Sequence, residues 1–234
     1  MANILDQYGI KEVADVTLYD LSTNLPVLFL DTLKVSTIEQ TAEQAEAKGG
    51  KGNSPLIIWD YGKEITVTLE DALFTPKSMH VMFGDGKKTL AAATATVTRM
   101  VYTPDIVAYT AALPTLNVPT LKYYSANDMS ALTTAPSSGA VYVEETRTSV
   151  ANTYTIEISA NSFPGTYKLV GDTYARNKAT GVDEYFQFII PQAKMGAENT
   201  LTLEAEGDPT VFNMTMRVLR PRDGVMMKLV KYTI

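Results

Sequence analysis

The chain has 234 residues, of which 45% are hydrophobic, and its formal net charge is −6. This composition is typical of a soluble globular protein, and the negative charge argues against nucleic-acid binding, which selects clusters of Lys and Arg. The chain has no cysteine and one histidine, His80, which excludes disulfides, thiolate chemistry and sites that need two imidazoles. The first ten residues do not resemble a signal peptide, and no apolar run approaches the roughly 20 residues of a membrane helix. We therefore expect no cofactor, no metal site and no membrane contact.

Segments with the pattern of β-strands recur along the chain. They are residues 14–21, 26–38, 64–71, 154–159, 199–207 and 211–220. The clearest alternation predicts two sets of buried side chains, namely Ile65, Val67 and Leu69 and then Phe212, Met214, Met216 and Val218. Turn signals lie at Gly165, Gly171, Gly181 and residues 207–209. Strands with one buried and one polar face are typical of antiparallel sheets, so we predict an all-β fold, an antiparallel β-sandwich or barrel.

Helix signals are scarce. We predict one short flanking helix from about Thr75 to Gly84, because Pro76 suits the first turn of a helix and Asp71 is a possible cap. Residues 39–48 have high helix propensity but almost no apolar face, so a helix there would be marginal alone.

The middle of the chain has a different composition. Residues 104–150 contain four prolines, at positions 104, 114, 119 and 136, and a Ser/Thr-rich stretch. We interpret this segment as an insertion or outer lobe within a single domain that spans residues 1–234.

The sequence "GGKGN" at residues 49–53 invites a comparison with phosphate-binding loops. Such a loop needs Ser or Thr directly after its Lys and then a helix, whereas here Lys51 is followed by Gly52 and then by a strand pattern. We therefore favour a long mobile arm between two strands, over about residues 39–54. This length is well above the 2–5 residues of usual hairpin loops, which indicates a function.

Other candidate chemistries have simpler explanations. His80 has no nucleophile or carboxylate at a catalytic spacing, so a packed or surface histidine is favoured. Asp172, Asp183 and Glu184 lack the dense spacing of a calcium loop. The neighbours Glu144 and Glu145 point to opposite faces if they lie in a strand, and Glu204 and Glu206 share a polar face. We predict that the protein is not an enzyme.

The order of segments resembles that of another protein family. A strand is followed by "IEQTAEQAEAKGGKGN", then by the Trp-bearing strand "PLIIWDYGKEITVTLEDALF" and a helix-like piece. With the carboxy-terminal run "FQFIIPQAKMGAENTLTLEAEGDPTVFNMTMRVLR", this looks like the tail tube proteins of bacteriophages, over residues 10–85 and 160–234. The resemblance implies a β-sandwich with a flanking helix, hexameric rings stacked into a hollow tube, and an acidic lumen through which DNA passes without specific binding. It also implies a location in the virion tail, reached from the host cytoplasm during assembly.

The resemblance also implies site residues and partners. The arm would contact adjacent subunits through Glu39, Gln40, Glu43, Glu46, Lys48, Gly49, Gly50, Lys51, Gly52, Asn53 and Trp59. Lumen-facing candidates are Thr200, Thr202, Glu204 and Glu206. Beyond other copies of the chain, the partners would be tail sheath, baseplate and tail terminator proteins.

Three alternatives stay open at this stage. The run 55–59 is apolar on both faces of a strand, which predicts burial of one face against the domain core and of the other under a helix or a neighbouring subunit. Trp59, the single tryptophan, lies in this run and belongs either to the core of its own subunit or to an interface. A capsid-decoration or host-recognition β-sandwich would have the same composition as a tube protein. A hydrolase with an unrecognised site is the weakest alternative.

Overall fold

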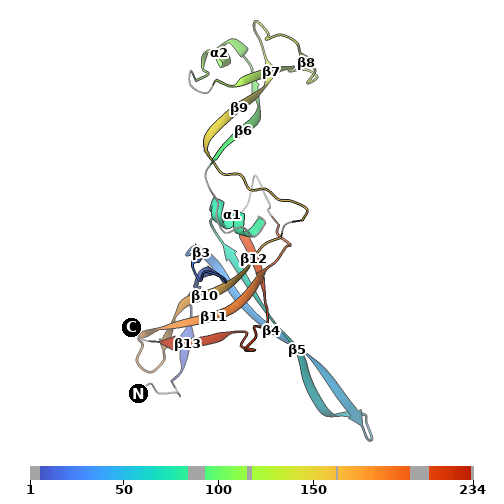
Figure 1. Cartoon of the computed structure of the whole chain (residues 1–234), viewed down its shortest axis with the longest axis vertical. Coiled ribbons are helices and arrows are strands. Elements are labelled where there is room, and N and C mark those ends of the chain that lie inside the picture. Colours follow the sequence, from blue (N-terminus) through green and yellow to red (C-terminus); the bar gives the residue numbers. More distant parts are fainter. Residues whose placement is uncertain (1–5, 84–92, 115–117, 162, 201–210, 233–234) are drawn as a thin grey trace. The chain divides into compact units, whose positions relative to one another are not determined.

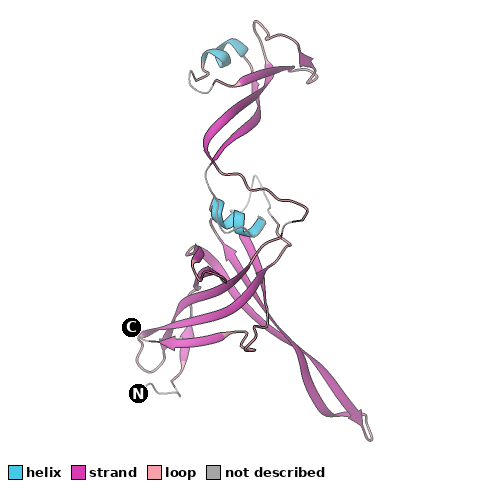
Figure 2. Ribbon diagram, viewed as in Figure 1, coloured by secondary structure: helices cyan, strands magenta, loops and turns pink. Residues whose placement is uncertain are grey.

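The computed structural model describes residues 6–83, 93–114, 118–161, 163–200 and 211–232 (Figure 1). The chain divides into two compact units. Unit 1 comprises Met1–Leu90 and Ile156–Ile234, and unit 2 comprises Ala91–Thr155, which includes the segment 104–150. Strands dominate both units (Figure 2), so the prediction of an all-β antiparallel fold is confirmed.

Unit 1 is built on one antiparallel sheet. Its strands are β1 (Tyr8–Ile10), β2 (Asp15–Asp20), β3 (Pro26–Leu30), β4 (Leu33–Gly49), β5 (Ser54–Asp71), β10 (Thr166–Asn177), β11 (Asp183–Met195), β12 (Phe212–Val218) and β13 (Lys228–Tyr232). The strand order is β3-β2-β10-β11-β12-β5-β4, with β1 added on β10 and β13 on β11. Sequentially distant strands therefore lie side by side, as β5 and β12 do.

The core of unit 1 lies on one face of this sheet. All seven side chains predicted to be buried in β5 and β12 are buried, as are Leu18 from β2 and Leu169 from β10. Helix α1 (Pro76–Phe83) adds Val81 and Met82 to the same cluster. Because this cluster joins β3 at one end of the strand order to β4 at the other, the sheet curls around its own core.

The predicted helix is confirmed, but its cap is not the one proposed. Thr75 and Ser78 form a reciprocal capping pair: the amide of Ser78 donates to Thr75 Oγ1 (3.0 Å), and that of Thr75 to Ser78 Oγ (2.9 Å). Asp71 lies at the end of β5, too far upstream to cap. Its Oδ1 instead accepts hydrogen bonds from the Thr32 hydroxyl (2.5 Å) and the Leu73 amide (3.2 Å).

One predicted strand and one predicted turn are wrong. Residues 154–159 alternate in sequence but form no strand, and Ile158 is 73% exposed. Alternation requires a partner strand to become a sheet, and no strand among the described residues pairs with this segment. Gly171 marks no turn but lies inside β10, where the ring of Phe188 packs so closely that a Cβ would come within 2.0 Å of it. The predicted turn at Gly181 is confirmed, whereas residues 207–209 lie outside the described residues.

Unit 2 holds a small sheet of its own. Strands β6 (Ala93–Thr103), β9 (Val141–Thr153), β7 (Thr120–Ser125) and β8 (Ala131–Leu132) pair in that order. Helix α2 (Ile106–Ala111), which the sequence analysis missed, begins at Asp105, whose Oδ1 accepts from the Val107 amide (2.9 Å). Ile106 packs against Val141 and Val143 of the sheet.

Glu145 anchors that helix to the sheet of unit 2. Its side chain is 1% exposed, and Arg99 Nε donates to Oε2 at 2.6 Å while the Tyr109 hydroxyl donates to Oε1. The bond from Arg99 holds the pKa of Glu145 below its usual value, and burial raises the pKa of Tyr109 to about 12. The neighbouring Glu144 instead pairs with Lys122 (2.8 Å), as expected for adjacent strand residues on opposite faces.

Candidate functional site

The long arm of the sequence analysis is a β-hairpin rather than a loop. Strands β4 and β5 pair from Leu33 and Asp71 at the base to Gly49 and Ser54 at the tip, which leaves only residues 50–53 as the turn. The helix propensity of residues 39–48 is overridden because their backbone pairs with β5. Gly50, Gly52 and Asn53 have positive φ angles (77°, 91° and 51°), so "GGKGN" supplies a tight turn.

A bulge at Gly62 changes which side chains share a face. Thr41 pairs with Glu64 but Glu43 pairs with Tyr61, so β5 carries one extra residue opposite Ala42. Gly62 has a φ of 61°, which is favourable for glycine. Side chains alternate along the regular strand β4. The odd-numbered residues of β5 therefore lie on the core side of the hairpin between the bulge and Asp71, and on the opposite side between the bulge and the turn.

We call residues 43–61 the outer hairpin. One of its faces carries Ile57, Trp59 and Tyr61 from β5, opposite Ala47, Ala45 and Glu43 from β4. The other carries Leu56, Ile58 and Asp60 from β5, with Ile58 and Asp60 opposite Glu46 and Gln44. Unlike the inner part of β5, neither face packs against a core of residues that the structure describes.

The apolar side chains of the outer hairpin are exposed. Leu56, Ile57, Ile58, Trp59 and Tyr61 have exposed fractions of 51–68%. The prediction that this run is buried on both faces is therefore wrong within one chain, because the outer hairpin extends beyond the rest of the sheet of unit 1 (Figure 1). With Trp59 53% exposed, the alternative that places it in the core of its own subunit is wrong as well.

The hairpin brings most of the candidate site residues together. Glu39, Gln40, Glu43, Glu46, Lys48 and Gly49 lie on β4, Gly50, Lys51, Gly52 and Asn53 form the turn, and Trp59 lies on β5. Glu46 pairs with Lys48 (2.8 Å), and Gln44 donates to Asp60 (2.8 Å). In the described part of the chain, neither Glu39 nor Glu43 has an ion-pair or hydrogen-bond partner.

The lumen-facing candidates are apart from this cluster. Thr200 is exposed and lies outside any strand. Thr202, Glu204 and Glu206 lie outside the described residues. Their orientation stays a prediction.

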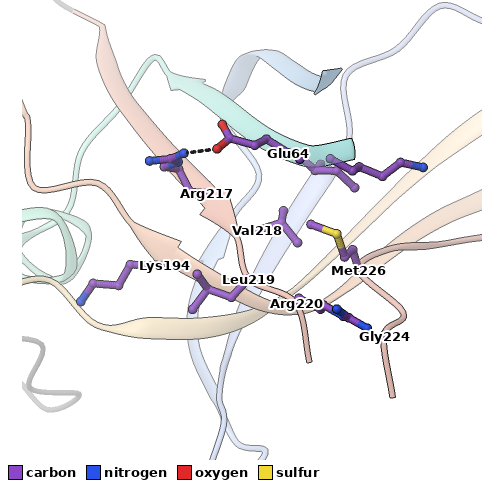
Figure 3. Close-up of a pocket in the computed structure, with 11 residues that line it drawn as sticks. Glu64, Lys194, Arg217, Val218, Leu219, Arg220, Gly224 and Met226 are labelled. Atoms are coloured by element: carbon purple, nitrogen blue, oxygen red, sulfur yellow. Dashed lines mark hydrogen bonds and ion pairs between the residues drawn. The ribbon is translucent and has the colours of Figure 1, made fainter. Parts of the chain in front are cut away.

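A groove that the sequence analysis missed lies at the base of the hairpin (Figure 3). It has a volume of about 820 Å³ and is lined by Gly62, Lys63, Glu64, Ile65, Lys194, Arg217, Val218, Leu219, Arg220, Gly224 and Met226. In the view of Figure 3, Val218, Leu219 and Met226 lie between Arg217 and Arg220. The run "RVLRPR" at residues 217–222 was a signal for it, because it concentrates three arginines in six residues.

The charges in this groove are mostly positive. Arg217 Nη2 donates to Glu64 Oε1 at 2.7 Å, and Lys194 Nζ donates to the carbonyl of Pro164. Lys63 and Arg220 have no such partner among the residues that the structure describes. The lining therefore combines apolar side chains with cations that have no partner among the described residues, which suits an apolar and acidic segment.

Comparison with known proteins assigns the chain to a family. The model of the YomU/Tube protein family matches residues 8–231, nearly the whole chain. The chain belongs to this family of phage tail tube proteins. A search of curated proteins finds no match. The resemblance inferred from the sequence is therefore confirmed, and the protein is a structural protein of the phage tail.

The three carboxylates that the sequence analysis weighed as calcium ligands make contacts within the fold of this tail tube protein. Asp183 pairs with Arg176 (2.6 Å), which lowers the pKa of Asp183, and Glu184 pairs with Lys231. Asp172 accepts from Gln187 (2.7 Å).

Two surveys of the described residues complete this description. No cluster of three or more His, Asp or Glu side chains among them could hold a metal ion. Neither helix in the described ranges is long and apolar enough to cross a membrane.

Proposed function

We propose that this tail tube protein self-assembles into rings that stack into the hollow tube through which phage DNA passes, and that the outer hairpin contacts a neighbouring subunit. The observation that supports this proposal is the uncovered apolar run of the hairpin. An isolated two-stranded hairpin is marginally stable in water, and exposed apolar patches of this kind mark interaction sites.

The free energy that burial of these apolar side chains would release favours a contact that forms in the assembled state. Complete burial of a large apolar side chain stabilises by about 1.5–3 kcal/mol. Five such side chains remain at least half exposed in one subunit, so covering them stabilises an assembly by on the order of 5 kcal/mol. That is sufficient to offset part of the entropy lost on association.

The finer features of the proposal come from the family resemblance. They are hexameric rings, a DNA path without specific binding, and tail sheath, baseplate and tail terminator proteins as further partners. The net charge of −6 suits a tube that DNA crosses without adhering, because a negative surface does not attract phosphates.

The test is assembly of the purified protein, observed by sedimentation velocity and negative-stain electron microscopy. Trp59 is the single tryptophan, so its emission reports on the hairpin alone. We expect tubes or rings, and an emission maximum that shifts to the blue as they form because Trp59 becomes covered. A wild-type protein that stays monomeric at all concentrations would contradict the proposal.

A shortened variant tests the role of the hairpin. Because Glu43 pairs with Tyr61, residues 44–60 can be replaced by Asn-Gly, which closes the strands with a two-residue turn. We expect a folded monomer that keeps a β-type far-UV spectrum and does not assemble. Normal tubes from this variant would show that the hairpin is not an assembly contact.

A further inference from the structure

We propose that the groove at the base of the hairpin receives the outer hairpin of a second copy of the chain. This inference rests on the proposed function, and it names the surface to which the hairpin binds. The face inserted would be the one that carries Trp59, Tyr61 and Glu43.

The first argument is complementarity of charge. Glu43 lies on the face of the outer hairpin that carries Tyr61 and Trp59, and Glu39 lies on the same face nearer the base, opposite Thr66. Neither carboxylate has a partner in the described part of its own subunit. The groove presents Lys63 and Arg220, which likewise have no partner among described residues. Free charges of opposite sign on two surfaces steer association and fix its register.

The second argument is complementarity of apolar surface. The lining of the groove includes Val218, Leu219 and Met226, and the hairpin face presents Ile57, Trp59 and Tyr61. A volume of about 820 Å³ lies within the range of about 300–1,000 Å³ that is usual for ligand pockets, so the groove has room for large side chains. Aromatic side chains seated in such pockets dominate the energy of protein interfaces.

The third argument is the position of the groove. Residues 62–65 line it, and they are also the base of the chain's own hairpin. The outer hairpin extends away from this base along paired strands, so it cannot insert into its own groove (Figure 1). Contact between the hairpin of one copy and the groove of another joins two different surfaces, and such heterologous contacts generate rings or filaments.

A charge-exchange experiment tests the inference. Lys63→Glu with Arg220→Glu reverses the groove, and Glu39→Lys with Glu43→Lys reverses the hairpin. We expect each double variant to need at least about tenfold more protein for assembly, and the fourfold variant to recover most of the loss. The matched control is Lys11→Glu with Lys34→Glu, which makes the same change in net charge at exposed positions outside the groove and should assemble as the wild type does.

A cross-linking measurement gives an independent readout, because the natural chain has no cysteine. One variant carries Ala45→Cys on the hairpin and the other Leu219→Cys in the groove. Mixing the two under oxidising conditions should give covalent dimers that neither variant forms alone. This result does not depend on whether the charge variants fold.

The outcomes separate the two proposals. If the wild type assembles while the groove variant assembles equally well and no mixed dimer forms, the groove inference is overturned and the proposed function stands. If reversal of the groove abolishes binding of a labelled DNA oligonucleotide but leaves assembly unchanged, the groove binds a polyanion and the inference is overturned. A wild type that never assembles overturns both.

Discussion

The inner and outer parts of strand β5 have similar apolar contents but opposite surroundings. In the inner part, Ile65, Val67 and Leu69 are buried in the core of unit 1. In the outer part, Ile57, Ile58 and Trp59 are exposed, and no other described part of unit 1 covers them. One strand therefore serves two hydrophobic surfaces, and Gly62 separates them. The comparison indicates that the inner surface stabilises the subunit and the outer surface acts between subunits.

The largest expected effect tests the inner surface. Leu69→Ala should lower the free energy of unfolding by about 2–5 kcal/mol, because it opens a cavity in a fully buried site. The matched control is Ile58→Ala in the outer part, where the change should stay within about 0.5 kcal/mol for the dissociated subunit. Urea unfolding followed by circular dichroism measures both, and equal losses would abolish the distinction between the two surfaces.

The next effect tests the outer surface. Trp59→Ala should leave unfolding of the subunit unchanged but weaken association by about 2 kcal/mol or more, which corresponds to roughly 30-fold. Sedimentation velocity over a concentration series measures this loss. Phe29→Ala is the control, since it removes a similarly exposed aromatic side chain (58%) that lies on β3, outside the hairpin. Unchanged association of the Trp59 variant would assign the outer surface to another role.

A smaller effect tests the boundary between the surfaces. Gly62→Ala forces alanine into a φ of 61°, which should cost about 1–2 kcal/mol of stability. It should also weaken assembly, because the bulge determines which side chains lie beside Trp59. Gly9→Ala is the control, since Gly9 has open space and no positive φ. A Gly62 variant with wild-type stability and assembly would show that the bulge is not required.

The smallest effect concerns a surface ion pair. Glu46→Gln removes the pair with Lys48, whose atoms are 2.8 Å apart on side chains that are both partly exposed. Such pairs contribute little in water, so neither unfolding nor the emission of Trp59 in the dissociated subunit should change measurably. A clear loss of assembly would show instead that Glu46 lies in the subunit contact.

Local patterns in the sequence were sufficient to predict strands that pair on a core. The alternation in residues 64–71 and 212–218 identified buried faces correctly, and Pro76 placed helix α1. Features that depend on distant partners were missed. Residues 39–48 become a strand only because residues 54–66 lie beside them, whereas residues 154–159 form no strand and have no partner strand in the described part of the chain.

The candidate site was predicted only in part, for a related reason. Its location in the segment 39–59 followed from the unusual composition of that segment, but its conformation did not. A run that is apolar on both faces was interpreted as doubly buried, since sequence alone does not distinguish a core from an uncovered ribbon. The groove was missed because its basic side chains come from separate strands, with Lys63 on β5, Lys194 on β11 and Arg217 on β12.

The division of unit 1 into two chain segments has a consequence for synthesis on the ribosome. Strand β5 pairs with β12 from Asp71 and Phe212 to Thr66 and Arg217, so its neighbour emerges only after all of unit 2 has been translated. The hairpin and the sheet of unit 2 have local partners and can form as the chain emerges, whereas the core of unit 1 closes late. A nascent chain therefore exposes the apolar side chains of its outer hairpin before the core of unit 1 has formed. The groove that we propose as the partner of this hairpin is lined in part by Arg217–Arg220, Gly224 and Met226, which are translated near the end of the chain. On a polysome, a nascent hairpin therefore meets no complete groove on a neighbouring nascent chain until synthesis is nearly finished.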